Sequence, residues 1–272
     1  MGKKRSSQVN VLLFAWVRRQ SMKVKSLLAG VFMVCSLIGL KFFLKDYNHF
    51  FIASEAIHAA GILVLIYKLT KQKTCSGLSL KAQELTAMFL AVRFLCSITM
   101  EGDIHTMLDF TTLTFTVWVI YMIRFKLKAT YIKELDNFPH YYLVVPSAIL
   151  ALLIYPYSPH GRIHQMLWAF CVNLESVSVL PQLRLMQNAK MIEPFTAHYV
   201  FALGVARFLS CAHWIIQVYE TGGRYLSLIG SGYLWFPMAI LAEAVQTFIL
   251  ADFCYYYIKS WKEGLLVMSM PV

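Results

Sequence analysis

The sequence predicts an all-α protein that crosses a membrane several times. Of its 272 residues, 58% are hydrophobic and only 14% are charged, and the mean hydropathy is +0.58. A soluble domain typically carries about 25% charged residues. Apolar windows of about 17–25 residues, the length that a helix needs to cross a bilayer, recur along nearly the whole chain. The composition excludes a soluble globular protein, and the net charge of +11 is interpreted as loop charge that orients the spans rather than as a nucleic-acid surface.

The first 45 residues are expected to form a cytosolic segment followed by a membrane helix. Residues 1–25 contain seven Lys or Arg and no acidic residue, which places them in the cytosol by the positive-inside rule. The next apolar run occupies residues 26–45. A cleaved signal peptide is the alternative, but its charged leader would be long, and no small-x-small cleavage site follows the run. We therefore expect an additional, retained transmembrane helix.

Seven further apolar segments complete a prediction of eight membrane helices. They are residues 50–69, 82–99, 104–123, 141–157, 163–181, 195–219 and 234–258. The loops between them are alternately rich and poor in Lys and Arg, and an even number of spans with this alternation places both termini in the cytosol. Residues 46–260 would then form a seven-helix domain, and residues 261–272 a cytosolic tail.

An internal repeat is predicted to relate two groups of three helices. Arg93 and Arg207 lie in closely similar pentapeptides that are 114 positions apart. Lys68 and Gln182 are separated by the same 114 positions. One helix lies between the two groups, so the groups share one orientation and form parallel repeats. Chance similarity of apolar helices is the alternative. In folds of this kind the binding site lies near the membrane midplane between the repeats.

Nine ionisable side chains inside the apolar spans predict a polar site within the bundle. They are Glu55, His58, Arg93, Asp109, Glu175, Arg207, His213, Glu243 and Asp252. A carboxylate near the bilayer centre costs roughly 2.5–3.5 kcal/mol unless it faces other helices or water. Glu175 is therefore expected to pair with Arg93, Arg207 or a protonated His58. A purely structural ion pair is the alternative for any one of them, but both repeats contribute, which favours a shared wet cavity.

His58 is the candidate for a pH switch, because imidazole changes charge near pH 6.5. A neutral histidine that donates to a backbone carbonyl is the alternative. Ser210, His213, Trp214 and Gln217 follow i, i+3, i+4, i+7 spacing and therefore share one helix face. Trp214 would either stack under a cation or belong to the aromatic belt at the membrane interface.

The sequence contains no motif of a hydrolase, a zinc protease, a phosphate-binding loop or a dinucleotide fold. Its six cysteines occur singly, five of them in apolar spans, and none has Cys-x-x-Cys spacing. Neither a disulfide framework nor a zinc site is indicated. We therefore expect no enzymatic activity, no metal and no cofactor.

Several motifs match those of one known family. They lie at residues 75–79, 116–121, 125–131, 143–151, 174–183, 198–204 and 252–253. On these motifs the chain resembles the KDEL (K/HDEL) receptor family, the ER lumen protein-retaining receptors that cycle between Golgi and endoplasmic reticulum. The resemblance covers roughly residues 48–260. It implies a SWEET-transporter-like core of two three-helix units and a linker helix, with the helix at residues 26–45 outside it.

The resemblance also implies a lumen-facing pocket that holds the C-terminal tetrapeptide of escaped lumenal proteins at acid pH. His58 and Glu175 match the histidine and carboxylate of the family's pH switch. Arg93 matches the arginine that anchors the terminal carboxylate of the ligand. Trp214 matches the aromatic residue beside the ligand's basic side chain, and Trp168 matches another tryptophan of the pocket.

The chain also departs from the family in this pocket. Phe51 and Gln217 stand where the family has two further arginines, and Cys96 and Gln165 replace acidic residues. Charge-assisted hydrogen bonds are worth roughly 1.5–3 kcal/mol each, so losing two arginines would weaken capture of a KDEL-type tail by several decades, at about 1.4 kcal/mol per decade. We expect an altered ligand preference, with His213, Gln165 and Gln217 as further candidates for ligand contacts.

The expected function is that of a receptor for a C-terminal retention signal or a related acidic tail, in Golgi and ER membranes. Coat or trafficking proteins on the cytosolic side would be the second partner. Asp252 matches an aspartate that the family uses in return transport, and Lys259 and Lys262 are the lysines of the predicted tail region. A trafficking or scaffold protein with a vestigial pocket is the first alternative, and a small-solute transporter is the second.

Overall fold

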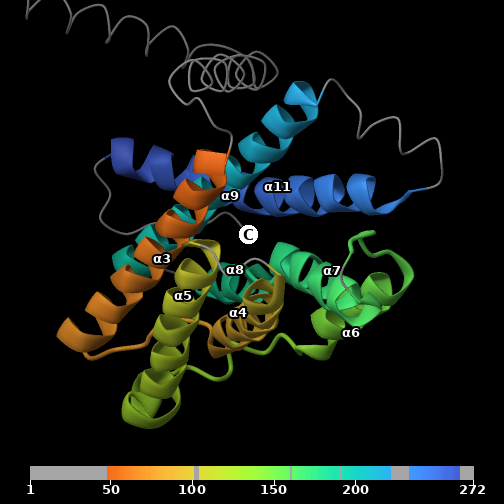
Figure 1. Ribbon diagram of the computed structural model, residues 1–272. Coiled ribbons are helices and arrows are strands. Elements are labelled where there is room, and N and C mark those ends of the chain that lie inside the picture. Colours follow the sequence, from red (N-terminus) through yellow and green to blue (C-terminus); the bar gives the residue numbers. More distant parts are fainter. Residues whose placement is uncertain (1–47, 101–103, 160, 190–191, 222–232, 264–272) are drawn as a thin grey trace, which may run out of the picture. The chain divides into compact units, whose positions relative to one another are not determined.

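The computed structural model describes residues 48–100, 104–159, 161–189, 192–221 and 233–263 (Figure 1). The regular elements of these segments are helices, and no strand occurs among them. The all-α fold class is therefore confirmed for the described part of the chain. The basic segment at 1–25, the helix predicted at 26–45 and the end of the predicted tail lie outside the described residues.

The helices follow the predicted spans closely. They are α3 (Asn48–Lys71), α4 (Leu80–Met100), α5 (Ile104–Tyr121), α6 (Tyr141–Leu153), α7 (Arg162–Val177), α8 (Leu180–Asn188), α9 (Pro194–Glu220) and α11 (Trp235–Lys262). A π-helical turn, η1 (Met122–Lys126), extends α5, and a short 3₁₀ turn, η2 (Lys128–Thr130), follows it. Figure 1 shows these elements along the chain.

One predicted span differs, because residues 163–181 form two helices instead of one. α7 ends at Val177 and α8 begins at Leu180, with Pro181 in its first turn. Proline has no N–H to donate to the carbonyl of Val177 four residues earlier, and its ring clashes with that carbonyl. The two helices still form one apolar segment of 27 residues, Arg162–Asn188, which is long enough to cross a membrane.

Among the described residues, six helical segments are long and apolar enough to cross a membrane, and α6 is apolar but shorter. α6 has 13 residues, and the chain becomes extended at Ile154. At 1.5 Å per residue, it spans about 20 Å, against about 30 Å for the hydrocarbon core. The span predicted at residues 141–157 is therefore shorter than expected. The protein is a polytopic membrane protein, and the regular elements of its described part are helices.

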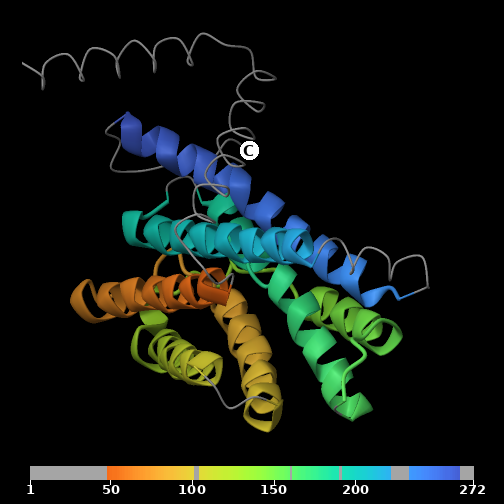
Figure 2. The same cartoon turned by 45° about the horizontal axis from the view of Figure 1, so that its top comes forward.

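The packing follows the predicted repeat of three helices. In the first unit α5 packs against both α3 and α4, and in the second unit α11 packs against both α7 and α9. Between the units, α3 packs against α9 and α4 against α7, so exchanging the units preserves the contacts. Figures 1 and 2 both show α3 beside α9. Gly61 allows this approach, because an added Cβ would lie 3.2 Å from the Ala202 Cβ.

The same shift of 114 positions relates two polar contacts at one end of the units. The buried Lys68 ammonium lies 2.7 Å from a Glu193 oxygen, and the Ser79 N–H donates to the Gln182 side chain at 2.9 Å. Glu193 accepts from an N–H in the first turn of α9, and Ser79 does the same for α4. Each N-terminal cap is thus joined to a helix of the other unit, as the repeat requires.

We expect the contact between Lys68 and Glu193 to make stability pH-dependent at low pH. Burial by itself would raise the pKa of Glu193, but the hydrogen bond and charge of Lys68 lower it below its ordinary value. A lowered carboxyl pKa stabilises the fold above the unfolded-state value, and the stability is lost as pH falls through the folded-state value. The melting temperature of the full chain should therefore fall below about pH 4.5, and less steeply in Glu193→Gln.

Glu134→Gln, a change in an exposed loop, is the control for this experiment. It should melt like the unchanged chain at every pH. An equally steep decline in Glu193→Gln would show that the carboxylate of Glu193 contributes no pH-dependent stability.

Candidate functional site

A cavity lies between the two repeats, lined by side chains of α3, α4, α7, α9 and α11. Its volume is about 70 Å³. A water needs roughly 10–15 Å³ of such space, so several waters fit. Five of the candidate site residues line it: His58, Arg93, Trp168, Glu175 and Trp214. Three further ionisable residues of the spans line it as well: Glu55, Arg207 and Glu243. Polar side chains of both repeats therefore meet in one place.

Arg93 of α4 is held between two carboxylates. Its Nε and Nη2 donate to Asp109 of α5 at 2.6–3.0 Å, and its Nη1 donates to both oxygens of Glu175 of α7 at 3.0 and 3.1 Å. The guanidinium also lies over the Phe89 ring, 5.6 Å from its centre. All three ionisable side chains are buried. Because both edges of the guanidinium are occupied, an acidic guest must displace one carboxylate to reach it.

Glu175 joins the arginines of the two repeats. Its Oε1 also accepts from Nη2 of Arg207 on α9, so the predicted pairing of Glu175 is confirmed for both Arg93 and Arg207. Its backbone carbonyl lies in the last turn of α7, where carbonyl groups lack helical partners. The side chains of Ser178 and Gln246 donate to this carbonyl at 2.9 and 3.1 Å. The end of α7 is thus fixed by α11 as well as by the ion pairs.

His58 of α3 lies beside these ion pairs. Its ring stacks on Phe89 with 6.5 Å between the ring centres, and it interacts electrostatically with Arg207, Glu175 and Arg93. A change in the charge of His58 would therefore alter the electrostatic energy of the ion pairs of both repeats.

A second acidic group of the cavity, Glu55 of α3, pairs with a histidine that is not among the residues predicted from the sequence. The Nδ1 of His105 lies 2.7 Å from Glu55 Oε2. His105 precedes Asp109 by four residues, so both lie on one face of α5. That spacing is the sequence signal that could have indicated His105.

Four other candidate residues do not line this cavity. Gln165 donates to the backbone carbonyl of Ser158 at 2.8 Å. The buried His213 ring lies 5.4 Å from Phe51 and 6.2 Å from Trp214, between ring centres. Gln217 lies one turn further along α9, and Asp252 is exposed on α11.

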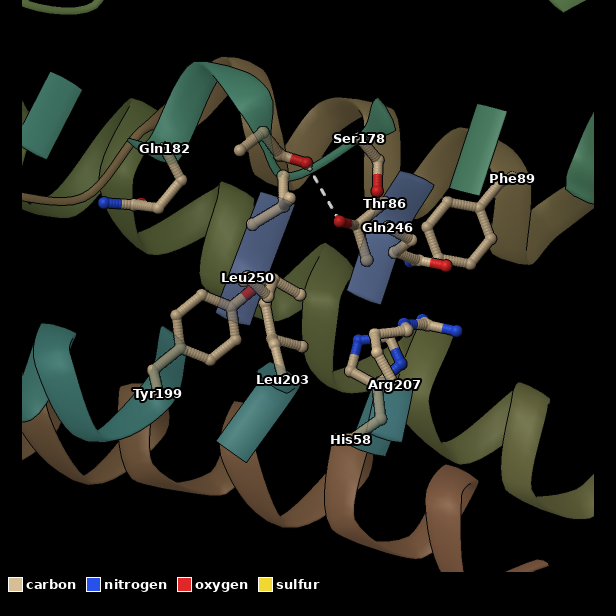
Figure 3. Close-up of a pocket in the computed structure, with 12 residues that line it drawn as sticks. His58, Thr86, Phe89, Ser178, Gln182, Tyr199, Leu203, Arg207, Gln246 and Leu250 are labelled. Atoms are coloured by element: carbon tan, nitrogen blue, oxygen red, sulfur yellow. Dashed lines mark hydrogen bonds between the residues drawn. The ribbon is translucent and has the colours of Figure 1, made fainter. Parts of the chain in front are cut away.

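His58 and Arg207 also line a second, smaller cavity of about 20 Å³. Figure 3 shows these two side chains together on one side of it and Gln182 and Tyr199 on the opposite side. The Gln246 side chain, which donates to the Glu175 carbonyl, lines this cavity too. Polar side chains therefore line both cavities along the interface between the repeats, from the ion pairs of Glu175 to Gln182.

In the described part of the chain, no group of three or more His, Cys, Asp or Glu could hold a metal ion. The five cysteines there are free thiols. The side chains around the cavity are suited to binding a charged guest.

Comparison with known proteins identifies the family. The family model described as ER lumen protein retaining receptor matches residues 74–217, which include Arg93, Glu175 and Arg207. An ER lumen protein-retaining receptor of Caenorhabditis elegans is 35% identical over 227 residues, 83% of this chain and 100% of the relative. Receptors of the same name from Petunia hybrida and Dictyostelium discoideum are 35% and 31% identical, each match covering 80% of this chain and 96% of the relative. The chain therefore belongs to the ER lumen protein retaining receptor family.

Proposed function

We propose that the chain binds the C-terminal retention signal of escaped lumenal proteins, or a related acidic tail, in the Golgi at acid pH for return to the ER. The observation that carries this proposal is the cavity in which His58, Arg93, Glu175 and Arg207 gather between the repeats. Buried guanidinium groups are strong, directional partners for a carboxylate. The relatives are named for the retention of ER lumen proteins, which supports this class of guest.

Protonation of His58 is the proposed link between acid pH and capture. The charged groups that face it are Arg207 of α9, Glu175 of α7 and Arg93 of α4. A new positive charge on the imidazole attracts Glu175 and competes with both arginines for it. A guanidinium that Glu175 releases is then free to bind the carboxylate of the guest.

The proposed ligand preference differs from that for a standard KDEL tail. The Phe51 ring packs 5.0 Å from His105 and 5.4 Å from His213, between ring centres, so this position supplies no cation. Asp109 already occupies one edge of Arg93. Both features lower the affinity expected for a guest that carries several carboxylates.

Return transport is proposed to depend on contacts at the cytosolic face with coat or trafficking proteins. Asp252, Lys259 and Lys262 are exposed in the C-terminal half of α11 and are available to such partners. With both termini in the cytosol, the cavity would face the lumen of the Golgi or ER.

His58→Ala is expected to remove the pH dependence of peptide binding. The unchanged chain should bind an acetylated Lys-Asp-Glu-Leu peptide on the order of tenfold more tightly at about pH 5.5 than at about pH 7.5, two values on either side of the pH near which a free imidazole changes charge. His58→Ala should bind it equally at both. The measurement is a titration of the purified full chain in detergent with a fluorescent form of the peptide.

His198→Ala is the matched control for this titration. His198 is an exposed residue of α9 that contacts the Tyr257 hydroxyl, outside the cavity. Its replacement should leave the pH dependence intact. Binding that still strengthens in acid in His58→Ala would refute the switch, and no binding of the peptide to the unchanged chain would refute the proposed capture of KDEL-type tails.

A further inference from the structure

The fold joins two basic segments that are far apart in the sequence. The backbone N–H of Cys75, in the loop between α3 and α4, donates to the hydroxyl of Thr130 in η2 at 3.0 Å. The Cys75 thiol donates to the Leu127 carbonyl at 3.3 Å. Four lysines lie within four residues of these contacts and are named here the lysine cluster: Lys71, Lys73, Lys126 and Lys128. Residues after α3 and after α5 thus form one basic surface.

The positive charge of the lysine cluster is not neutralised within the described part of the chain. All four side chains are exposed, and none of them forms an ion pair with a described residue. Two acidic groups of the same region have other partners. Glu84 lies 3.7 Å from Arg124, and the buried Asp136 accepts from the Ser79 and Tyr131 hydroxyls at 2.7 Å. The cluster therefore offers its charge to an anion from outside the chain.

A lipid-facing side of α5 leads directly to this cluster. Exposed side chains recur every three or four residues along α5, which places them on one face of the helix: Ile104, Met107, Phe110, Thr114, Val117 and Tyr121. The next residue on this face is Phe125, which is 68% exposed and whose ring centre lies 5.5 Å from that of Tyr121. Aromatic residues at the end of a membrane helix mark the level of the lipid headgroups. The lysines beside Phe125 therefore lie at headgroup level.

The π-helical turn η1 brings cations onto this lipid-facing side. Along Ile104–Tyr121 the exposed residues occur singly, whereas Arg124, Phe125 and Lys126 are exposed in succession. The Leu127 N–H donates to the carbonyl five residues earlier at 2.8 Å, which widens the turn. Turns of this kind are frequent at functional sites. Here the turn places basic side chains beside the aromatic end of the lipid-facing side.

Charge complementarity identifies the kind of lipid. A cluster of four or more Lys or Arg directly after a membrane helix attracts anionic headgroups, and each cation contributes about fivefold to the affinity. A phosphate monoester carries a charge of about −1.5 to −2 at neutral pH, more than the single charge of a phosphodiester. Lysine binds phosphate as a point charge. Four unpaired lysines are therefore best matched by a headgroup with a phosphate monoester.

We propose that the lysine cluster binds the headgroup of a phosphoinositide, a lipid with a phosphate monoester on its inositol ring, whose acyl chains lie along the exposed side of α5. By the positive-inside rule this basic end lies in the cytosol, and the anionic lipids belong to the cytosolic leaflet. One headgroup then bridges the segment after α3 and the segment after α5. The site is separate from the cavity between the repeats and does not depend on the capture of a peptide.

The experiment compares two lipids that differ only in the phosphate monoester. Dioctanoyl phosphatidylinositol 4-phosphate and dioctanoyl phosphatidylinositol are titrated onto the fluorescently labelled full chain in a neutral detergent. We expect the unchanged chain to bind the phosphorylated lipid at least about tenfold more tightly. Lys126→Gln with Lys128→Gln should weaken its binding by about 25-fold, at about fivefold per cation. Lys126→Arg with Lys128→Arg, which keeps both charges, should bind like the unchanged chain.

Two controls separate this site from general attraction of charge. Arg184→Gln with Lys259→Gln removes two exposed cations from α8 and α11 and should bind the phosphorylated lipid like the unchanged chain. Soluble inositol 1,4-bisphosphate has the phosphates without the acyl chains, and we expect it to bind at least about tenfold more weakly because it cannot contact α5.

Three results would overturn the proposal. They are equal affinity for the two lipids, an equal loss of affinity in the control variant, and equal affinity for the soluble headgroup, which would indicate a site for free phosphates. The comparison of the two lipids is made on the unchanged chain, so it decides the question even if a variant fails to fold.

Discussion

Replacing Glu175 with alanine is expected to destabilise the full chain by about 3–5 kcal/mol, the cost of leaving a buried charge without its partner. The carboxylate joins Arg93 of the first repeat to Arg207 of the second, and all three side chains are buried. After the replacement Arg93 keeps Asp109, but Arg207 loses the carboxylate to which it donates. The measurement is thermal unfolding of the detergent-solubilised chain, with a large fall in melting temperature expected.

Two further variants separate the charge from the shape of Glu175. Glu175→Gln keeps an acceptor oxygen, so its melting temperature should lie between that of the alanine variant and that of the unchanged chain. Adding Arg207→Met to Glu175→Ala removes the unpaired charge, so the double variant should be more stable than Glu175→Ala alone. If Arg207→Met instead destabilises Glu175→Ala as much as it destabilises the unchanged chain, the two residues do not act as a pair.

Part of the site could be predicted because ionisable residues are scarce in the apolar spans. A carboxylate within a membrane must find a cation or water, so Glu175 had few partners, and the structure shows it paired with two of them. The repeat was visible for a related reason. Lys68 and Gln182 occupy equivalent places because each must join its unit to the other.

Other contacts could not be predicted because they depend on the rotation of each helix. The sequence marks Asp109 as an ionisable residue, but apolar and Thr residues surround it in α5, so periodicity does not show which face meets Arg93. The contact between His105 and Glu55 depends on the same rotation. The break before Pro181 ends α7 two residues after Glu175, and the predicted continuous span gave no reason to expect Gln246 at that end.

Asp109→Asn is expected to strengthen the binding of an acidic tail by about ten- to a hundredfold. Asp109 accepts from Nε and Nη2 of Arg93 at 2.6–3.0 Å and so competes with the guest for that guanidinium. Asparagine has nearly the same shape but no negative charge. A charge-assisted hydrogen bond is worth about 1.5–3 kcal/mol, and each tenfold change in affinity corresponds to about 1.4 kcal/mol. The measurement is a titration with acetylated Lys-Asp-Glu-Leu at acid pH.

The direction of this effect makes it a strict test of Arg93 as the anchor. Substitutions that disturb a fold weaken binding, so a gain in affinity cannot be attributed to a damaged protein. Asp252→Asn, an exposed change on α11, controls for the loss of one negative charge from the chain and should leave the affinity unchanged. If Asp109→Asn binds the peptide no more tightly than the unchanged chain, the carboxylates of the guest do not reach Arg93, and the anchor must be another cation of the cavity, with Arg207 the first to test.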